Sequence, residues 1–512
     1  MTSKKITALY LLFLSLVVFI PGVFAHAEEV TLAWKPGPGE VTGYRIYCST
    51  RSAVYSSDNI DVGNVTEYTV TGLHKSTTYY FVVRAYNSYG EGGNSNEVRW
   101  PLFRALYFPH VAVSKGWDTE IAVINTSDNR SLSGTLVGIG NDGREVESMS
   151  FKLYARARRE IRVSEAFNDL ENISYMVFMS DSDDLCGYSK FYVEGKYRAA
   201  LPAVLRINEG DIHIPHIASS AEWTTAISLV NTTSFTRALK IEFDNGQTDT
   251  IILWPGHCFA DNIRNFPVFG GEPQPGIGSA VIKNADGIVG FELFSCGNCL
   301  AGILLSDNVS PTIYYPHVVS NDTWYTTVVA YNPSDIPCNI GIASYSRSGA
   351  LLGSKVVSVD GKSRYIGMVR NLGLPADTAW LRFDAPVPVA GFELFMNHDR
   401  TQLAGYACVD INRRQGVFSK LDRNGGTGIA FVNTEGMEAS VILTAYSNTG
   451  VVVATGTEYL APYEKLVKTA EDFFADDISS ATYIGFSSNR EVAGSQFNVS
   501  VDGMMLDALS VM

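Results

Sequence analysis

The cysteine pair Cys296 and Cys299 has the spacing of a metal or redox motif in this 512-residue chain. Zinc takes four ligands, and only Cys258 and His257 lie in the same stretch, at no recognised spacing. A redox pair of this type opens a helix, whereas the flanking apolar runs predict two strands joined at Gly297-Asn298. We therefore expect a hairpin with either a small disulfide or two free thiols, and no bound metal.

Two glutamates, Glu292 and Glu393, are the nearest candidates for the paired acids of a glycosidase. Such a pair must lie about 5–10 Å apart. These two occupy equivalent places in two copies of a repeated unit, so we expect about a domain between them. The sequence also lacks a nucleophile-elbow, zinc-protease or phosphate-binding motif. We expect no catalytic residues, no cofactor and no enzyme.

A His, Trp and Asn motif recurs three times and is the best candidate for ligand binding. A Trp face with polar neighbours can stack on a sugar ring. If adjacent strands bring the three residues to one end of a domain, the candidates are His110, Trp117, Asn125, His216, Trp223, Asn231, His317, Trp324 and Asn332. The residues favour a structural role over ligand binding. Each Asn ends an expected strand and can satisfy backbone in an Asx-turn, and each His, preceded by Pro, would be half-buried.

The motif also sets the domain organisation. Trp and Asn are eight residues apart in each copy, and Asn433 follows Asn332 by 101 residues, although Ser419 and Gly425 replace the His and Trp there. A second landmark has the same period: Gly187, Gly290, Gly391 and Gly494. A period of about a hundred residues is one small domain, so we predict four tandem repeats at 103–206, 207–308, 309–411 and 412–512.

Within a repeat, apolar residues alternate with period two between turn residues, as at 324–332, 339–346 and 351–359. Seven or eight such runs predict an all-β, antiparallel β-sandwich. Further apolar runs lie at 379–383, 389–396 and 403–409. One short helical turn is expected per repeat, near 163–170, 260–266, 366–372 and 466–474. The joins between repeats are short, which favours a semi-rigid rod.

The segment 28–102 precedes the repeats. It contains the strand-like runs 30–34, 43–47, 68–73 and 78–87, with Trp34 in the core position and Tyr79 where a corner tyrosine would stand. On these residues the segment resembles a fibronectin type III domain, which implies a seven-stranded sandwich of the immunoglobulin-like kind. The four repeats resemble uncharacterised secreted bacterial β-sandwich repeats, a resemblance that implies no activity.

The N-terminus predicts export. Lys4 and Lys5 precede an apolar run and the small residues Ala25 and Ala27, the pattern of a signal peptide over 1–27. We expect a periplasmic, extracellular or cell-surface protein without a membrane span after cleavage; the alternative is an uncleaved inner-membrane tether. The chain has an odd number of cysteines, and their pairing stays open: Cys48, Cys186, Cys258, Cys296, Cys299, Cys338 and Cys408.

The net charge of −14 disfavours nucleic acid as a partner. Repetition without catalytic motifs predicts a non-enzymatic exported bacterial protein, acting as an adhesive or spacer rod whose partner is a protein or glycan at the cell surface. The alternative function is carbohydrate binding as an accessory to a glycan-processing system.

Overall fold

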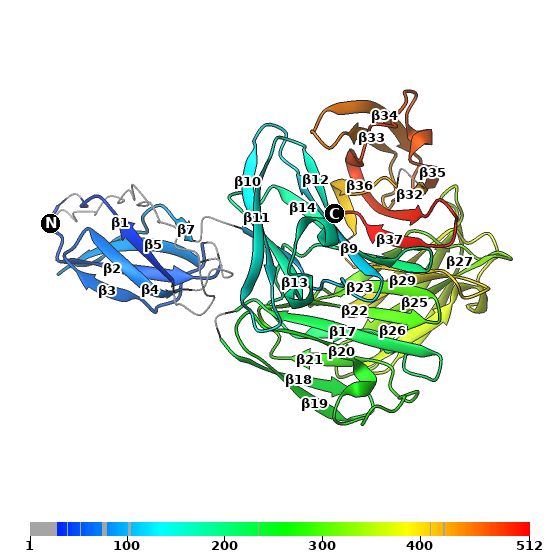
Figure 1. Cartoon of the computed structure of the whole chain (residues 1–512), viewed down its shortest axis with the longest axis horizontal. Coiled ribbons are helices and arrows are strands. Elements are labelled where there is room, and N and C mark those ends of the chain that lie inside the picture. Colours follow the sequence, from blue (N-terminus) through cyan, green and yellow to red (C-terminus); the bar gives the residue numbers. More distant parts are fainter. Residues whose placement is uncertain are drawn as a thin grey trace.

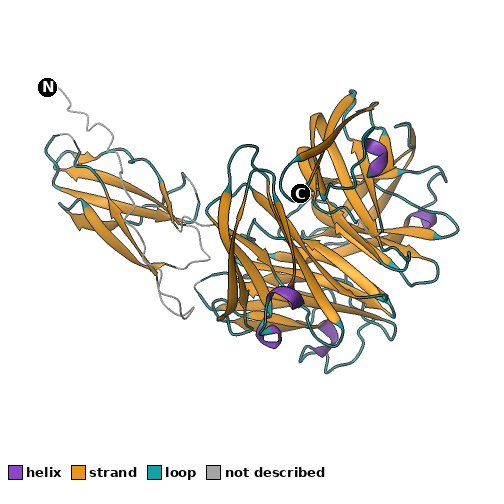
Figure 2. Cartoon of the chain, turned by 45° about the horizontal axis from the view of Figure 1, so that its top comes forward, coloured by secondary structure: helices purple, strands orange, loops and turns teal. Residues whose placement is uncertain are grey.

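A computed structural model describes residues 28–37, 39–51, 53–73, 79–100, 104–233, 235–409, 411–422 and 425–512. The predicted signal peptide, 1–27, lies outside these residues. Nearly all of the regular secondary structure in the described chain is strand, with a few short helical turns (Figure 2). No helix in the described ranges is long and apolar enough to cross a membrane.

The N-terminal domain is a sandwich of two antiparallel sheets, ordered β1-β4 and β3-β2-β5-β6, with β7 also on β5. Its core includes Trp34 and the half-buried Tyr79, which packs on Trp100. The expected strand positions are confirmed. The strands are β1 (Glu28–Ala33), β2 (Gly43–Ser49), β3 (Ile60–Gly63), β4 (Glu67–Leu73), β5 (Tyr79–Asn87), β6 (Gly90–Glu91) and β7 (Val98–Trp100).

The four repeats are all-β sandwiches. The first contains β8 (Arg104–Phe108), β9 (Trp117–Asn125), β10 (Leu132–Ile139), β11 (Glu145–Leu153), β12 (Arg158–Arg162), α1 (Val163–Ala166), the 3-10 turn η1 (Leu170–Asn172), β13 (Tyr175–Ser180), β14 (Leu185–Val193) and β15 (Tyr197–Pro202). The second contains β16 (Ile212–Ile214), β17 (Trp223–Asn231), β18 (Arg237–Phe243), β19 (Thr248–Leu253), β20 (Cys258–Asn262), η2 (Ile263–Asn265), β21 (Ala280–Lys283), β22 (Ile288–Cys296) and β23 (Cys299–Leu305).

The third and fourth repeats follow the same order, except that the two strands after the helical turn are joined into one long strand, β29 or β36. The third contains β24 (Ser310–Tyr315), β25 (Trp324–Asn332), β26 (Cys338–Tyr345), β27 (Leu351–Val359), β28 (Ser363–Met368), η3 (Val369–Asn371), β29 (Trp380–Asn397) and β30 (Leu403–Ala407). The fourth contains β31 (Asn412–Phe418), β32 (Gly426–Asn433), β33 (Ala439–Tyr446), β34 (Val452–Leu460), β35 (Lys465–Thr469), η4 (Glu471–Phe473), β36 (Tyr483–Val499) and β37 (Leu506–Ser510).

Each repeat has an inner and an outer sheet. The inner sheet contains the strand that runs from the motif Trp to the motif Asn, as in β12-β9-β14-β15, and the outer sheet is the other, as in β11-β10-β13-β8. The two faces enclose a separate apolar core in each repeat. The runs predicted as separate strands at 379–383 and 389–396 form one continuous strand, β29. Its first half pairs with β26 in the outer sheet and its second half with β25 in the inner sheet. The helical turns are present but shorter than predicted, and the first repeat has a second one.

The predicted rod is wrong, because the four repeats close into a ring. The last strand of each inner sheet packs against the last strand of the next: β15 on β23, β23 on β30, β30 on β37, and β37 back on β15. The C-terminus therefore lies beside the first repeat, while the N-terminal domain projects from one side of the ring (Figure 1), where its Arg51 pairs with Glu209 of the second repeat at 3.0 Å. Short joins are equally compatible with a tight turn between neighbours, and buried contacts between repeats decide in favour of the ring.

The joints between repeats, numbered 1/2, 2/3, 3/4 and 4/1, carry apolar clusters of their own. At joint 1/2, Tyr107 and Tyr175 of the first repeat pack on Val230 and Val289 of the second. At joint 3/4, Trp380 packs on Val432. Burial of this kind is the main favourable contribution to association between domains, so the ring is a single packed body rather than four beads.

Candidate functional site

The motif asparagines have a structural role in all four repeats. Each side chain is fully buried. In the first repeat, the Asn125 amide donates to the carbonyls of Arg130 at 2.7 Å and Tyr154 at 2.9 Å, and its oxygen accepts the Ser127 N–H at 3.0 Å. Equivalent bonds tie down Asn231, Asn332 and Asn433. The Asx bond expected from the sequence is thus present, and these amides have no free donor for a ligand.

The motif histidines lie in the joints. The His110 ring packs on Phe191 of its own repeat and on Phe291 of the next, with centroids 5.6 and 6.0 Å apart. His317 likewise contacts Phe497 of the fourth repeat at 5.0 Å. Burial lowers the pKa of His110 to about 4, so its imidazole is neutral near pH 7.

His216 occupies the same position at joint 2/3 but makes a polar contact. Its Nδ1 accepts a hydrogen bond from Nε of Arg364, in the third repeat, at 2.9 Å. Burial, and then the charge of Arg364, lower the pKa of His216 to about 3. The three histidines therefore connect neighbouring repeats.

The motif residues of one repeat do not meet in a single site. Trp117 and Asn125 are the two ends of β9, and eight residues of strand span about 26 Å. The tryptophans are half-buried: Trp117 packs on Tyr197 with centroids 4.9 Å apart, and Trp223 on the apolar cluster of joint 2/3. The prediction that adjacent strands bring His, Trp and Asn to one end of the sandwich is therefore wrong, because the strand holds the Trp and the Asn apart.

Joint 4/1 explains why the fourth repeat lacks the Pro-His pair. Lys420 follows the substituted Ser419 and lies in a buried charged cluster. Its Nζ is 2.5 Å from Glu120 of the first repeat, and Lys190 reaches the same carboxylate at 2.8 Å. Burial alone would raise the pKa of Glu120, but the two lysines hold it well below its usual value.

A second ion-pair group extends joint 4/1. Arg198 of the first repeat lies 2.9 Å from Asp422 and 2.7 Å from Asp507 of the fourth. Ring closure therefore rests on paired, buried charges together with apolar contacts such as Ile124 on Val417 and Tyr483.

Joint 2/3 differs from the other three in how its turns meet. At the other joints, the turn that joins β10 to β11, β26 to β27 or β33 to β34 contacts the next repeat directly. One backbone hydrogen bond crosses each of these joints: Cys258 N to Asn141 O at 3.2 Å, Lys465 N to Arg347 O at 2.9 Å, and Arg158 N to Asn448 O at 2.9 Å. At joint 2/3 the equivalent bond would join Arg364 to Asp244, and it is missing among the described residues. A groove of about 690 Å³ opens there between the two repeats.

The two glutamates lie in adjacent repeats at the same inner-sheet position. Both are fully buried. Glu393 accepts a hydrogen bond from the Tyr406 hydroxyl, and burial raises its pKa to about 8. Glu292 has no partner for either oxygen among the described residues, and burial raises its pKa well above normal. A buried protonated carboxyl without access to solvent is not arranged as a general acid.

The cysteine pair lies in the predicted hairpin, opposite each other on β22 and β23. All seven cysteines are thiols in this structure. The Cys299 thiol donates to the carbonyl of Arg400, in the third repeat, at 2.8 Å. Within the described ranges no group of three or more His, Cys, Asp or Glu is placed to hold a metal ion.

Comparison with known proteins identifies the N-terminal domain. Residues 23–99 match the family model of the fibronectin type III domain. This segment is a fibronectin type III domain. A solved fibronectin type III domain derived from human KIAA0970 protein has 19% identity and a TM-score of 0.15, covering 19% of this chain and 72% of that one.

Two curated relatives match over short stretches. The Kelch domain-containing protein SSO1033 of Saccharolobus solfataricus is 49% identical over 72 residues, which is 14% of this chain and 10% of the relative. Human receptor-type tyrosine-protein phosphatase F is 38% identical over 119 residues, 21% of this chain and 6% of the relative. The chain spans at most a tenth of either relative, so these matches extend only to short segments and carry no whole-protein activity over to this chain.

Proposed function

We propose that the chain is a non-enzymatic exported protein that acts by binding, with the ring as a rigid platform and the fibronectin type III domain as an arm. The ring replaces the spacer role of the predicted rod, because a closed ring is too compact to hold two surfaces far apart. The adhesive role is kept. The recurring Asn side chains hold turns within a repeat, and the recurring His side chains connect neighbouring repeats, so neither needs a ligand to explain it.

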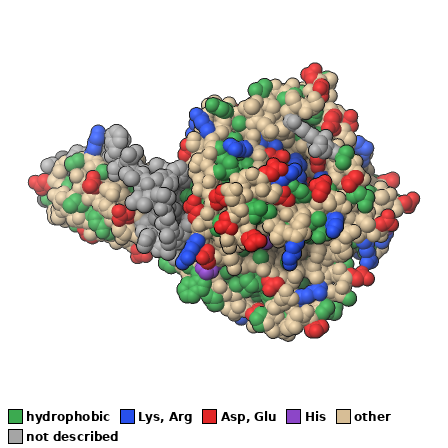
Figure 3. All heavy atoms as spheres, in the orientation of Figure 1, with side chains coloured by type: hydrophobic (Ala, Val, Ile, Leu, Met, Phe, Trp, Pro, Cys, Tyr) green, Lys and Arg blue, Asp and Glu red, His purple; other side chains and the backbone are tan. Residues whose placement is uncertain are grey.

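One observation carries the adhesive role. Large exposed apolar side chains recur on or beside the same edge strand of each outer sheet, which is β11, β19, β27 or β34. They are Tyr154, Ile252, Trp254, Leu351, Val356, Val452 and Tyr459. Apolar side chains gathered on one exposed surface are characteristic of interaction sites, and recurrence at the same edge in each repeat gives several equivalent weak sites that gain avidity together. Elsewhere, acidic and basic side chains are interspersed on the face that Figure 3 shows.

Retention of coated beads tests the adhesive role. Beads carrying the full chain would be flowed over bacterial cells, glycan-coated surfaces and matrix proteins. We expect retention on at least one surface, reduced by the triple change Trp254→Ser, Val356→Ser and Tyr459→Ser. Tyr89→Ser is the matched control, since Tyr89 is 95% exposed but lies on the fibronectin type III domain. Turnover in a panel of hydrolase substrates, lost on mutating a few residues of one repeat, would overturn the non-enzymatic role.

Export is tested separately by cell fractionation and the mass of the mature N-terminus. We expect cleavage after Ala25 or Ala27 and recovery in the periplasm, in the medium or on the cell surface. Recovery of the uncleaved chain with the inner membrane would support the tethered alternative instead.

A further inference from the structure

Among the described residues, joint 2/3 differs from the other three joints because the hairpin turn of its outer sheet makes no backbone bond to the next repeat. Gly143, Gly349 and Gly450 occupy the same turn position in the first, third and fourth repeats, and each lies against backbone of the next repeat. Gly246 is the equivalent glycine of the second repeat, and nothing lies within 4 Å of a Cβ built there. The turn of the second repeat therefore makes no such contact with the third repeat, and the space between them is the groove.

A side chain holds this joint together in place of the missing backbone bond. Arg364 reaches past the turn to His216 and lies against Gly278. On the second repeat, the carboxylate of Asp244 is held in place by accepting the Gly278 N–H at 3.0 Å. Hydrogen bonds therefore fix Asp244 on the second repeat and Arg364 on the third.

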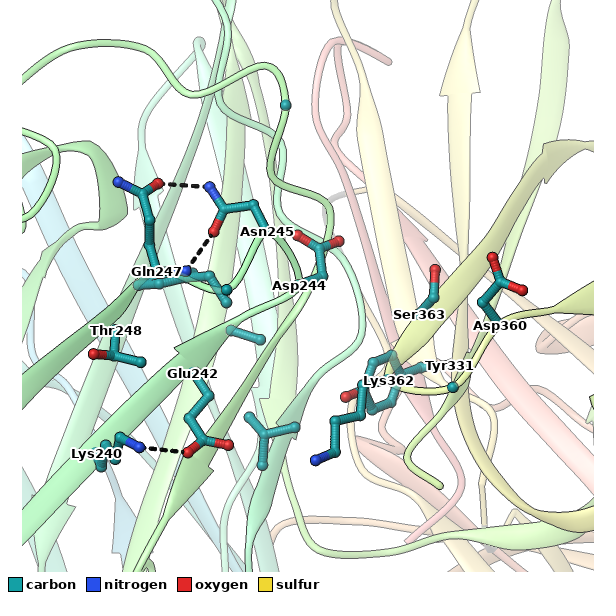
Figure 4. Close-up of a pocket in the computed structure, with 16 residues that line it drawn as sticks. Lys240, Glu242, Asp244, Asn245, Gln247, Thr248, Tyr331, Asp360, Lys362 and Ser363 are labelled. Atoms are coloured by element: carbon teal, nitrogen blue, oxygen red, sulfur yellow. Dashed lines mark hydrogen bonds and ion pairs between the residues drawn. The ribbon is translucent and has the colours of Figure 1, made fainter. Parts of the chain in front are cut away.

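The groove is lined by hydrogen-bonding groups of both kinds. On the second repeat, Lys240 pairs with Glu242 at 2.8 Å, and the amide of Asn245 donates to Gln247 at 2.5 Å (Figure 4). Facing them on the third repeat are Asp360, Lys362 and Ser363. The buried side chains of Val281 and Tyr331 pack together at the base.

Several of these groups have no protein partner to satisfy them. In the described part of the chain, the side chains of Thr248, Asp360 and Ser363 make no hydrogen bond, although all three line the groove. Such groups can exchange water for a ligand without breaking protein contacts. Other lining groups are already held by neighbours, which reduces the entropy lost on binding.

The balance of charge selects the class of ligand. Two lysines and three carboxylates line the groove, which leaves one net negative charge. A phosphate or nucleic acid would be repelled. A sugar suits the lining, since each hydroxyl both donates and accepts, and the groove offers carboxylates, amides, hydroxyls and ammonium groups.

We propose that this groove binds a neutral oligosaccharide. The proposal deepens the binding role argued above and rests on it. The proposed carbohydrate site is therefore the groove at joint 2/3, in place of the motif tryptophans considered from the sequence.

The test uses the folded full chain and a panel of neutral oligosaccharides, including cellobiose, maltose, lactose, chitobiose and their longer homologues, measured on an array and by calorimetry. We expect binding to at least one series. Asn245→Ala and Asp360→Ala should each weaken it about tenfold, the effect of losing one or two good hydrogen bonds. Ser363→Trp should abolish it by filling the groove.

Asp142→Ala is the matched control, because Asp142 holds the Asn245 position in the seated turn of joint 1/2 and should leave binding unchanged. Absence of binding to the whole panel, or binding indifferent to Asp360→Ala and Ser363→Trp, overturns the proposal. Bead retention measured on the same variants separates the two ideas. Adhesion without sugar binding rejects only the groove, and sugar binding without adhesion rejects only the adhesive platform.

Discussion

At the scale of single residues, one inner-sheet position carries a buried polar side chain in every repeat, and the repeats differ in the hydrogen-bond partner that they provide for it. The position holds Ser189, Glu292, Glu393 and Gln496, all fully buried. Gln496 donates to the Lys420 carbonyl at 2.8 Å, and Glu393 has the hydroxyl of Tyr406 on the facing strand. Glu292 faces Ile303 instead. A buried carboxyl without a partner destabilises the fold.

Replacing Glu292 should therefore stabilise the protein. The raised pKa of Glu292 means that its folded form holds a proton more tightly than its unfolded form, so stability is lost as pH rises above the unfolded value of about 4.3. Glu292→Leu should raise the free energy of unfolding by about 1–3 kcal/mol at pH 7 and by less at pH 4. Denaturant titrations at the two pH values measure this.

Glu393→Leu is the control at the equivalent position. It removes the partner of Tyr406 and should give no such gain. A loss of stability for Glu292→Leu at pH 7 would show that its carboxyl is satisfied in solution.

The motif asparagine is the residue-scale feature that the sequence predicted best. Asn332 donates to the carbonyls of Ile336, Val359 and Asp360. Asn332→Ala leaves these buried acceptors unpaired and should cost about 2–4 kcal/mol. Asn339→Ala, at an exposed position on β26, should change the free energy of unfolding by less than about 0.5 kcal/mol. Equal losses for the two variants would contradict the structural role of the motif.

At the scale of elements, the hairpin turns decide how repeats meet. Gly349 and Gly246 are equivalent turn residues with φ of +88° and +84°. Alanine is strained at both, which costs about 1 kcal/mol. Only Gly349 also lies against the next repeat, near Pro462 and Tyr463. The pair therefore separates backbone strain from contact across a joint.

Gly349→Ala should cost about 1–3 kcal/mol more than Gly246→Ala, because the added methyl group collides with fixed backbone. Chemical denaturation of the two variants measures the difference. Equal costs would mean that the turn of the third repeat does not contact the fourth repeat in solution.

Sequence patterns predicted the elements well and their assembly poorly. Period-two alternation located β25 and β27 to the residue, because successive side chains of an extended strand point to opposite faces of the sheet. The sequence did not indicate which turns contact the next repeat. Gly143 and Gly246 both allow a positive φ in a hairpin turn, and they differ only in what lies across the joint. The open groove was missed for the same reason: its lining comes from two repeats.

At the scale of the whole molecule, closure of the ring could not be inferred from the repeat. The contacts that close it are absent from the shared motif: Glu120 and Lys420 are 300 residues apart, and their equivalents in other repeats are not charged partners. A repeated sequence indicates that neighbours pack alike, but a rod and a ring share those contacts. Only the fourth joint distinguishes them, and its buried charge cluster is formed by residues without charged equivalents at the other joints.

The closing joint provides the test of the ring itself. Glu120→Ala leaves Lys190 and Lys420 buried without their shared carboxylate, which should cost about 3–5 kcal/mol. Glu222→Ala, which breaks the exposed pair with Arg400, should cost less than about 1 kcal/mol. Because the folded pKa of Glu120 is depressed, its contribution is fully present above the unfolded value of about 4.3 and is lost progressively as pH falls from that value through the folded pKa.

Calorimetry and small-angle scattering read out the consequence. In the intact protein the four repeats should unfold together, with the fibronectin type III domain as a separate transition, because every repeat shares buried surface with two neighbours. With Glu120→Ala, or in the intact protein at pH 3, joint 4/1 should open first: the radius of gyration rises and the shared transition splits. Four transitions that are already independent in the intact protein, with a scattering profile unchanged by Glu120→Ala, would restore the rod and remove the basis for an adhesive ring.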